Sequence, residues 1–301
     1  MTISPRDARA PRPAAVHGAL VLVQLAFASL AVLGKIAMRT VPPQGLALAR
    51  MGGGALVFVA LARAQATAPR LTRAELLRLA VYSLLGVSGT QLLFLEGLSR
   101  TTATNASVLV ATIPVFTVLV SLGLRREKAR PALVLGIVLA LAGALFIVGV
   151  EAFHLGPETV LGDALILLNC AMYALYLVLV RDLVTRHGAS WIIALAFAMG
   201  AAVALPFGAG PLATALPELD AETAALVVYI VLVPTVAAYL ANAWALRFAR
   251  PSVVAIYVYL QPLAAGALAA WLLHERPNER ALPGALAIFA GIALVTEPWA
   301  R

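Results

Sequence analysis

Apolar residues in this chain form long uninterrupted runs instead of alternating with polar ones. One of them, "ALVLGIVLALAGALFIVGV" from Ala132 to Val150, contains no charged residue. A run of this length approaches the roughly 20 residues with which a helix crosses a bilayer. Runs bounded by charges or by Pro and Gly predict ten membrane spans. They cover residues 17–38, 43–63, 76–98, 102–124, 131–150, 160–181, 190–209, 224–247, 252–273 and 281–299.

The length of these runs also predicts the type of secondary structure. A segment in hydrocarbon must satisfy its own backbone hydrogen bonds, which a helix does within itself. Strands of a membrane barrel are shorter and alternate in polarity. The predicted fold class is therefore an all-α polytopic membrane protein with ten transmembrane helices.

Composition agrees with a membrane protein and excludes an ordinary soluble domain. Of the 301 residues, 62% are hydrophobic and 12% are charged, against about 45–50% and about 25% in soluble domains. The net charge of +8 would suggest nucleic acid in a soluble chain. Here Lys and Arg fall mostly between the apolar runs, where they orient a protein in the membrane. The predicted partners are a lipid bilayer and a small solute, without nucleic acid.

The distribution of basic residues predicts the orientation of the chain. With the N-terminus inside the cell, inner connections and helix ends hold sixteen Lys and Arg, whereas outer ones hold five. Positive residues favour the cytoplasmic side, so both termini are expected in the cytoplasm. The Arg- and Pro-rich residues 1–16 have no convincing cleavage site and are interpreted as a cytoplasmic tail before an uncleaved first helix.

Residues for metal, disulfide or nucleotide chemistry are sparse. Cys170 is the only cysteine and lies inside an apolar run, where it is typical of a small packed residue. The four histidines are scattered, and no Gly-x-x-x-x-Gly-Lys pattern occurs. We therefore expect no metal site, no cofactor and no direct use of ATP by this chain.

An internal repeat emerges when the chain is shifted by 148 residues. Five spans then fall in each half, and an odd number of spans turns the second copy upside down in the membrane. Inverted repeats are typical of secondary transporters, whose solute site lies near the midplane between the halves. We expect one five-helix repeat over residues 17–150 and a second over 151–301. The matched pairs are Pro114 with Pro262, Glu127 with Glu275, Gly136 with Gly284, and Gly143 with Gly291.

The residues of the two halves resemble a known family. Lys35 and Arg181 close the first span of each half, the segment "LALAR" ends in Arg50, and mid-span prolines, a following Glu and paired glycines complete each pattern. In these features the chain is similar to the EamA-type halves of the drug/metabolite transporter superfamily. The resemblance implies a transporter of amino acids, nucleotide sugars, drugs or other small metabolites. The second half has no evident counterpart of the Arg50 segment.

Polar side chains inside the spans predict where a solute binds, because such residues usually face a protein interior or an aqueous cavity. Several recur at helical spacing, and the resemblance places their spans around the central cavity. Each is alternatively an interhelical hydrogen bond or an interfacial aromatic. As a set they suit a small amphipathic solute. The predicted substrate-binding residues are Gln91, Asn105, Thr112, Asn169, Tyr173, Tyr176, Tyr239, Asn242, Trp244, Tyr257 and Gln261.

Two kinds of residue inside the spans point to further roles. Mid-span Pro removes a backbone donor, so Pro114, Pro234 and Pro262 are candidate helix kinks, although membrane helices also tolerate Pro without such a role. Arg50 and Glu96 are charges within span limits. Glu96 either couples transport to protons or, as we favour, pairs with Arg50 or Lys35. Arg50 either binds an anionic substrate or, as we favour, has a structural role at the periphery.

These features predict a secondary active transporter of a bacterial inner membrane, not an enzyme. It is expected to export or exchange a small metabolite, such as an amino acid, a related amphipathic solute or a drug, by alternating access. It would act as a monomer or homodimer. The alternative is an intramembrane enzyme acting on lipid or a small headgroup, which would need clustered His, Asp, Glu or Cys near one interface.

Overall fold

The computed structural model describes residues 12–65, 68–149, 156–264, 267 and 280–296, and within these ranges the secondary structure is entirely helical. The prediction of an all-α membrane protein is confirmed. Within the described residues, eight helices are long and apolar enough to cross a membrane. Two shorter apolar helices, Pro251–Ala264 and Ala281–Thr296, lie where the ninth and tenth spans were predicted.

Helices of the first half begin where the sequence supplies start signals. Thr72 precedes α3, and its hydroxyl accepts the backbone N–H of Glu75 while the Glu75 carboxylate accepts the N–H of Thr72, which forms a capping box. Pro131 occupies the first turn of α7, where its missing N–H costs nothing. The elements are α1 (Pro13–Ala37), α2 (Pro43–Gln65), α3 (Arg73–Ser83), η1 (Leu84–Gly89), α4 (Thr90–Arg100), α5 (Ala103–Val110), α6 (Ile113–Gly123) and α7 (Pro131–Val148).

The second half repeats this order. Asp220 caps α10 by accepting the backbone N–H of Thr223 at 2.7 Å, and this hydrogen bond holds the pKa of Asp220 below its ordinary value. The elements are α8 (Val160–His187), α9 (Ala189–Ala215), η3 (Leu216–Glu218), α10 (Ala221–Val231), η4 (Leu232–Ala237), α11 (Ala238–Phe248), α12 (Pro251–Ile256), η5 (Tyr257–Leu260) and α14 (Ala281–Thr296).

Helix α9 extends six residues beyond the predicted end at residue 209, despite containing Pro206 and Pro211. The reason is tertiary packing against α2. A Cβ atom added to Gly45 would lie 3.0 Å from the backbone nitrogen of Leu212, and one added to Gly208 would lie 2.6 Å from the carbonyl oxygen of Gln44. Close contact with a neighbouring helix therefore keeps the chain helical through both prolines.

Two irregular helical segments occur at matching places in the halves. The π-helical segments η1 and η4 begin at Leu84 and Leu232, which lie 148 residues apart. In η4 the wide turn contains Pro234, which cannot donate to the regular helix ladder. In η1 it contains Gly86, where any Cβ would collide with the ring of Tyr176. Different residues thus accompany the same backbone irregularity.

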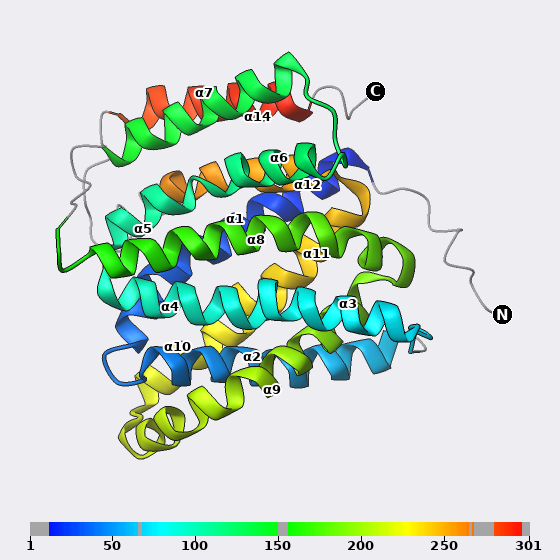
Figure 1. The fold of residues 1–301 in the computed structure, drawn as a ribbon. Helices are drawn as coiled ribbons and strands as arrows, with labels where there is room; N and C mark the ends of the chain where they lie inside the picture. The colour runs from blue at the N-terminus through cyan, green and yellow to red at the C-terminus, as the bar shows by residue number, and fades with distance from the viewer. Residues whose placement is uncertain (1–11, 66–67, 150–155, 265–266, 268–279, 297–301) are drawn as a thin grey trace.

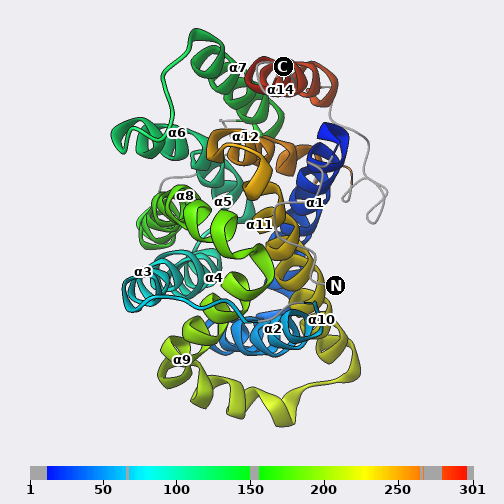
Figure 2. The same ribbon diagram turned by 90° about the vertical axis from the view of Figure 1, so that its right-hand side faces the viewer.

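Helices α7 and α14 form a pair at one edge of the bundle, at the top of both ribbon views (Figures 1 and 2). A Cβ on Gly136 would lie 2.7 Å from the Gly291 carbonyl oxygen, and one on Gly143 would lie 2.6 Å from that of Gly284. The earlier residue of α7 faces the later residue of α14, so the two helices run antiparallel. Because α7 and α14 are the equivalent helices of the two halves, the repeat relates the contact of Gly136 with Gly291 to the contact of Gly143 with Gly284.

The basic residues that close the first span of each half make equivalent contacts. Lys35 Nζ donates to the carbonyl oxygen of Thr101 at 2.7 Å, and Arg181 Nε donates to that of Ala249 at 3.1 Å. Thr101 and Ala249 both lie at the junction between the third and fourth spans of their half. These side chains satisfy backbone carbonyls that the ends of α4 and α11 leave without intrahelical donors.

Candidate functional site

A central cavity lies between the two halves, with about 690 Å³ of empty space including its opening. The first half supplies α1, α2, α4, α5 and α6 to its wall, and the second half supplies α8, α11, α12 and η5. The wall is mainly apolar, with a few converging polar groups, as in many small-molecule sites. Its residues are Gln24, Phe27, Leu30, Arg50, Thr90, Gln91, Phe94, Val110, Ile113, Asn169, Tyr173, Leu177, Tyr239, Asn242, Val254, Ala255, Val258 and Gln261.

Some of the predicted substrate-binding residues line this cavity. Asn242 on α11 donates to the hydroxyl of Tyr173 on α8 at 3.1 Å, which links two helices of the second half. Gln261 donates to Gln24 on α1 at 2.8 Å, which links the two halves. The predicted residues that line the cavity are Gln91, Asn169, Tyr173, Tyr239, Asn242 and Gln261.

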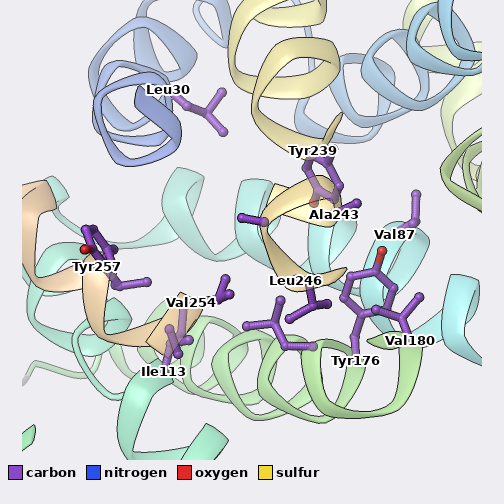
Figure 3. Close-up of a cluster of buried hydrophobic side chains, with 14 of the residues drawn as sticks. Leu30, Val87, Ile113, Tyr176, Val180, Tyr239, Ala243, Leu246, Val254 and Tyr257 are labelled. Carbon is purple, nitrogen blue, oxygen red and sulfur yellow. The ribbon is translucent and has the colours of Figure 1, made fainter. Parts of the chain in front are cut away.

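Tyr239 is the centre of an aromatic cluster at the cavity. Its ring makes edge-to-face contacts with Phe27 at 5.9 Å and with Phe197 at 4.9 Å between centroids. Figure 3 shows Tyr239 projecting from α11 into the interior and Tyr176 rising from α8 toward the same region. Phe27 and Tyr239 offer a flat apolar surface beside the polar groups.

Arg50 is the charged residue in this wall. It is only 2% exposed, and its Nε donates to the hydroxyl of Thr235 in η4 at 3.0 Å. Its charge also lies close enough to Tyr239 to interact electrostatically with the phenol. The peripheral position that we expected for Arg50 is wrong, because α2 packs against η4 and α4 and brings the guanidinium to the cavity.

Two predicted residues are held by polar contacts outside the cavity wall. Asn105 donates to the buried carboxylate of Asp163 at 3.1 Å, and the Thr101 hydroxyl donates to the same carboxylate at 2.6 Å. Thr112 donates to the carbonyl of Leu109 one turn earlier at 2.6 Å. Sequence reasoning missed Asp163, which lies in the first turn of α8 and therefore resembled an ordinary helix-start acid.

Three predicted aromatic residues likewise lie outside the wall. Tyr176 packs where Gly86 leaves room for its ring. Trp244 packs against Phe248 with centroids 5.4 Å apart. Tyr257 is hydrogen-bonded to His17 and stacks on its ring, and Figure 3 shows it on η5, well apart from Tyr239.

The cavity also contains residues that sequence reasoning missed. Gln24, Phe27, Thr90 and Phe94 line it although none was predicted to do so. A signal existed for Gln24, because it is the one amide in the apolar run of the first span and a polar residue there is a functional candidate. Nothing in the local pattern separates Phe27 and Phe94 from phenylalanines that face lipid.

Glu96 does not form the ion pair that we favoured. Its carboxylate accepts from Arg100 one turn later on α4, with Nε at 2.7 Å, and from Gln44 on α2 at 2.6 Å. Arg50 and Lys35 bind Thr235 and Thr101 instead. The expected partners of Glu96 were therefore wrong, and Glu96 lies outside the cavity wall.

Each candidate kink proline lies beside a change in helix geometry. Pro114 is the second residue of α6, and the preceding helix α5 ends at Val110. Pro234 lies inside the π-helix η4, and Pro262 follows the 3-10 turn η5. The fourth predicted span corresponds to the candidate membrane span Asn105–Gly123, which is interrupted by a turn at Ala111 and Thr112, next to Pro114.

Fold and cavity together define a polytopic helical membrane protein in which two similar halves enclose a mainly apolar site with a few polar groups. Residues 16–149 and 160–297 each match the EamA-like transporter family. The chain belongs to this family and is a membrane transporter.

Individual relatives agree with this assignment. The chain is 30% identical over 286 residues to an uncharacterized transporter of Archaeoglobus fulgidus, which covers 93% of this chain and 96% of the relative. A solved crystal structure matches the fold with a TM-score of 0.76 at 20% identity, over 96% of this chain and 98% of that one.

Proposed function

We propose that this protein is a secondary active transporter that exports or exchanges a small amphipathic metabolite by alternating access. The observation that carries the proposal is the composition of the cavity wall. Both halves contribute polar groups to one site, for example Gln91 from the first and Asn242 from the second. A site shared by two halves becomes accessible from either side when the halves move relative to one another.

The repeat geometry supports this mechanism. We propose ten spans arranged as two inverted five-helix repeats, residues 17–150 and 151–301. Equivalent helices α7 and α14 run antiparallel, as an inverted repeat requires. The matching π-helices η1 and η4 place an irregular backbone in both halves, next to the cavity residues Thr90 and Tyr239. Irregular helices at a midplane site are typical of secondary transporters.

Contacts between α1 and the segment around η5 suggest where the halves separate. Gln24 and Gln261 are hydrogen-bonded at the cavity. His17 and Tyr257 are hydrogen-bonded closer to the N-terminus of α1. Both pairs join the first half to the second through side chains alone. In the proposed cycle these pairs break when the site opens toward that end of the bundle.

The cavity chemistry supports an amphipathic solute such as an amino acid, a related metabolite or a drug. Asn169, Asn242 and Gln261 offer hydrogen bonds, while Phe27 and Tyr239 offer aromatic surface. We further propose location in a bacterial inner membrane with both termini in the cytoplasm, on the basis of the basic-residue distribution. A reporter active only in the cytoplasm, fused after Arg301, tests that orientation.

Counterflow in proteoliposomes tests the transport function. Purified protein is reconstituted with internal unlabelled amino acids, sugars, nucleosides or cationic drugs, and entry of the labelled solute is measured with and without a pH gradient. We expect at least one solute to exchange faster than in empty liposomes. Asn242→Ala should slow this exchange, whereas the matched change Ser99→Ala at an exposed hydroxyl should not. Equal rates with and without protein for every solute would contradict the proposal.

A further inference from the structure

We infer that the solute carries a carboxylate, which binds Arg50 and Gln91 in the central cavity. The inference rests on the proposed function, because it assigns the chemical class of ligand for the same site. Two independent observations carry it: a buried cation without a carboxylate partner, and a buried amide without any partner.

The first observation concerns the charge balance of the cavity. Arg50 is buried, and among the described residues its one hydrogen-bond acceptor is the Thr235 hydroxyl at its Nε. The ion pairs formed within the described ranges involve Arg100, Arg126, Arg186 and His187, not Arg50. None of the described residues that line the cavity is Asp or Glu. The terminal guanidinium nitrogens are thus left available to a ligand.

A guanidinium in this position remains charged, because Arg is not deprotonated in proteins. A buried charge without a partner is unfavourable in a low-dielectric interior, and proteins normally pair it. Nε is already held by Thr235, so the guanidinium is fixed in orientation before any ligand arrives. A carboxylate that binds the remaining nitrogens supplies the missing charge and uses their fork geometry.

The second observation concerns Gln91 on α4, which lines the same cavity. Its side chain is buried with 2% exposure, and neither Nε2 nor Oε1 has a hydrogen-bond partner among the residues that the structure describes. Buried amides normally have partners, so an amide with none at a cavity wall is placed to hydrogen-bond a molecule in the cavity. Its N–H can donate to a carboxylate oxygen, and its carbonyl can accept from a donor elsewhere on the solute.

The rest of the wall favours a monocarboxylate over a phosphate. A dianionic phosphate would need more positive charge than one guanidinium supplies, and Arg50 is the one Lys or Arg among the described lining residues. The aromatic rings of Phe27, Phe94 and Tyr239 instead suit an apolar body attached to the carboxylate. The predicted ligand is therefore an amphipathic molecule with one carboxylate end.

Binding of matched probes to the purified full-length protein tests the inference. We would use 3-phenylpropionate, 3-phenylpropanamide and 3-phenylpropylamine, with hexanoate, hexanamide and hexylamine as an aliphatic series. Within each series only the end group changes. Calorimetry and thermal shift in detergent should show tighter binding of a carboxylate than of its amide or amine.

Three variants separate recognition of the carboxylate from a structural role of Arg50. Arg50→Gln should weaken carboxylate binding by about 10–100-fold, the loss expected for a charge-assisted hydrogen bond. Arg50→Lys should weaken it less, because the charge remains while the fork is lost. Gln91→Leu should weaken it without removing the charge. The ligand-free melting temperature of Arg50→Gln should equal or exceed that of the wild type, because an unpaired charge has been removed.

The outcomes distinguish this inference from the proposed function. If amides or amines bind as tightly as carboxylates and Arg50→Gln leaves their affinity unchanged, the carboxylate assignment is overturned, while counterflow of those solutes would still support transport. A large loss of ligand-free stability in both Arg50→Gln and Arg50→Lys would also overturn it. If carboxylates bind in an Arg50-dependent way but no solute shows counterflow, the transport function fails and the binding site stands.

Discussion

Two regions lie between the halves, and their packing differs. Helices α7 and α14 are in close contact, whereas the helices around the central cavity leave space between them. In the α7–α14 contact, Gly136 and Gly143 bring backbone against backbone, and aliphatic side chains of α14 lie beside them. In the cavity the helices stay apart, and amides, phenols and one guanidinium face the gap.

The difference separates packing between helices from the presentation of polar groups to the cavity. In lipid the hydrophobic effect does not hold helices together, so close approach through small residues is what joins α7 to α14. The cavity wall contributes less to packing and keeps polar groups such as those of Gln91 unpaired. The glycine contacts between α7 and α14, like those of Gly45 and Gly208 between α2 and α9, therefore join the halves, while the cavity wall presents polar groups to the space between them.

The largest expected effect is at the glycine contact. Gly143→Ala places a Cβ 2.6 Å from the carbonyl oxygen of Gly284, so the helices must separate. We expect a loss of about 1–3 kcal/mol in stability, as for overpacking elsewhere, measured by thermal unfolding in detergent. The matched control is Gly52→Ala in α2, where an added Cβ meets nothing within 4 Å. Equal melting temperatures for both variants would contradict the close contact.

Effects of intermediate size are expected at Asn105 and Asn242, whose roles the sequence could not distinguish. Asn105→Ala removes a donor to the buried Asp163 carboxylate, so stability should fall by about 1–2 kcal/mol while solute affinity is kept. Asn242→Ala removes a cavity group, so affinity should fall about tenfold or more with little change in melting temperature. Calorimetry and thermal unfolding of both variants provide the measurement. The reverse assignment of effects would place the solute near Asp163 instead.

The smallest effect is expected at Glu96. Its partner Arg100 is half exposed, with a side-chain exposure of 49%, and exposed ion pairs contribute about 0–1 kcal/mol. Glu96→Gln retains an oxygen that can accept from Gln44, so the melting temperature should stay close to that of the wild type. Counterflow with and without a pH gradient is the measurement. A variant that transports but no longer responds to the gradient would identify Glu96 as the proton-coupling carboxylate.

The sequence predicted the helical class and the position of most spans because both depend on local properties. Length and hydropathy of a run determine whether it can cross hydrocarbon. Prediction failed where contacts between helices decide the outcome. Helix α9 continues beyond its predicted end at residue 209 and through Pro211 because of its packing on α2.

Helical spacing found polar stripes but could not tell which members face the cavity. Asn169 and Tyr173 line it, while Tyr176 on the same stripe packs against Gly86 of η1. All three residues lie on the continuous helix α8, and no local pattern encodes which neighbouring helix each side chain meets. A polar stripe can thus be predicted from the sequence of one helix, whereas a cavity depends on how several helices pack.

The sequence by itself determined that this chain is a helical membrane protein of two similar halves, because bilayer thickness and backbone hydrogen bonding leave few alternatives for such runs. Only the tertiary structure decided where the charges act. Arg50, expected at the periphery, lies in the cavity wall, and Glu96, expected to neutralise it, binds Arg100 and Gln44. The physical reason is that the cost and the role of a charge depend on what lies within a few ångströms of it, and for Arg50 those neighbours come from residues far away in the chain.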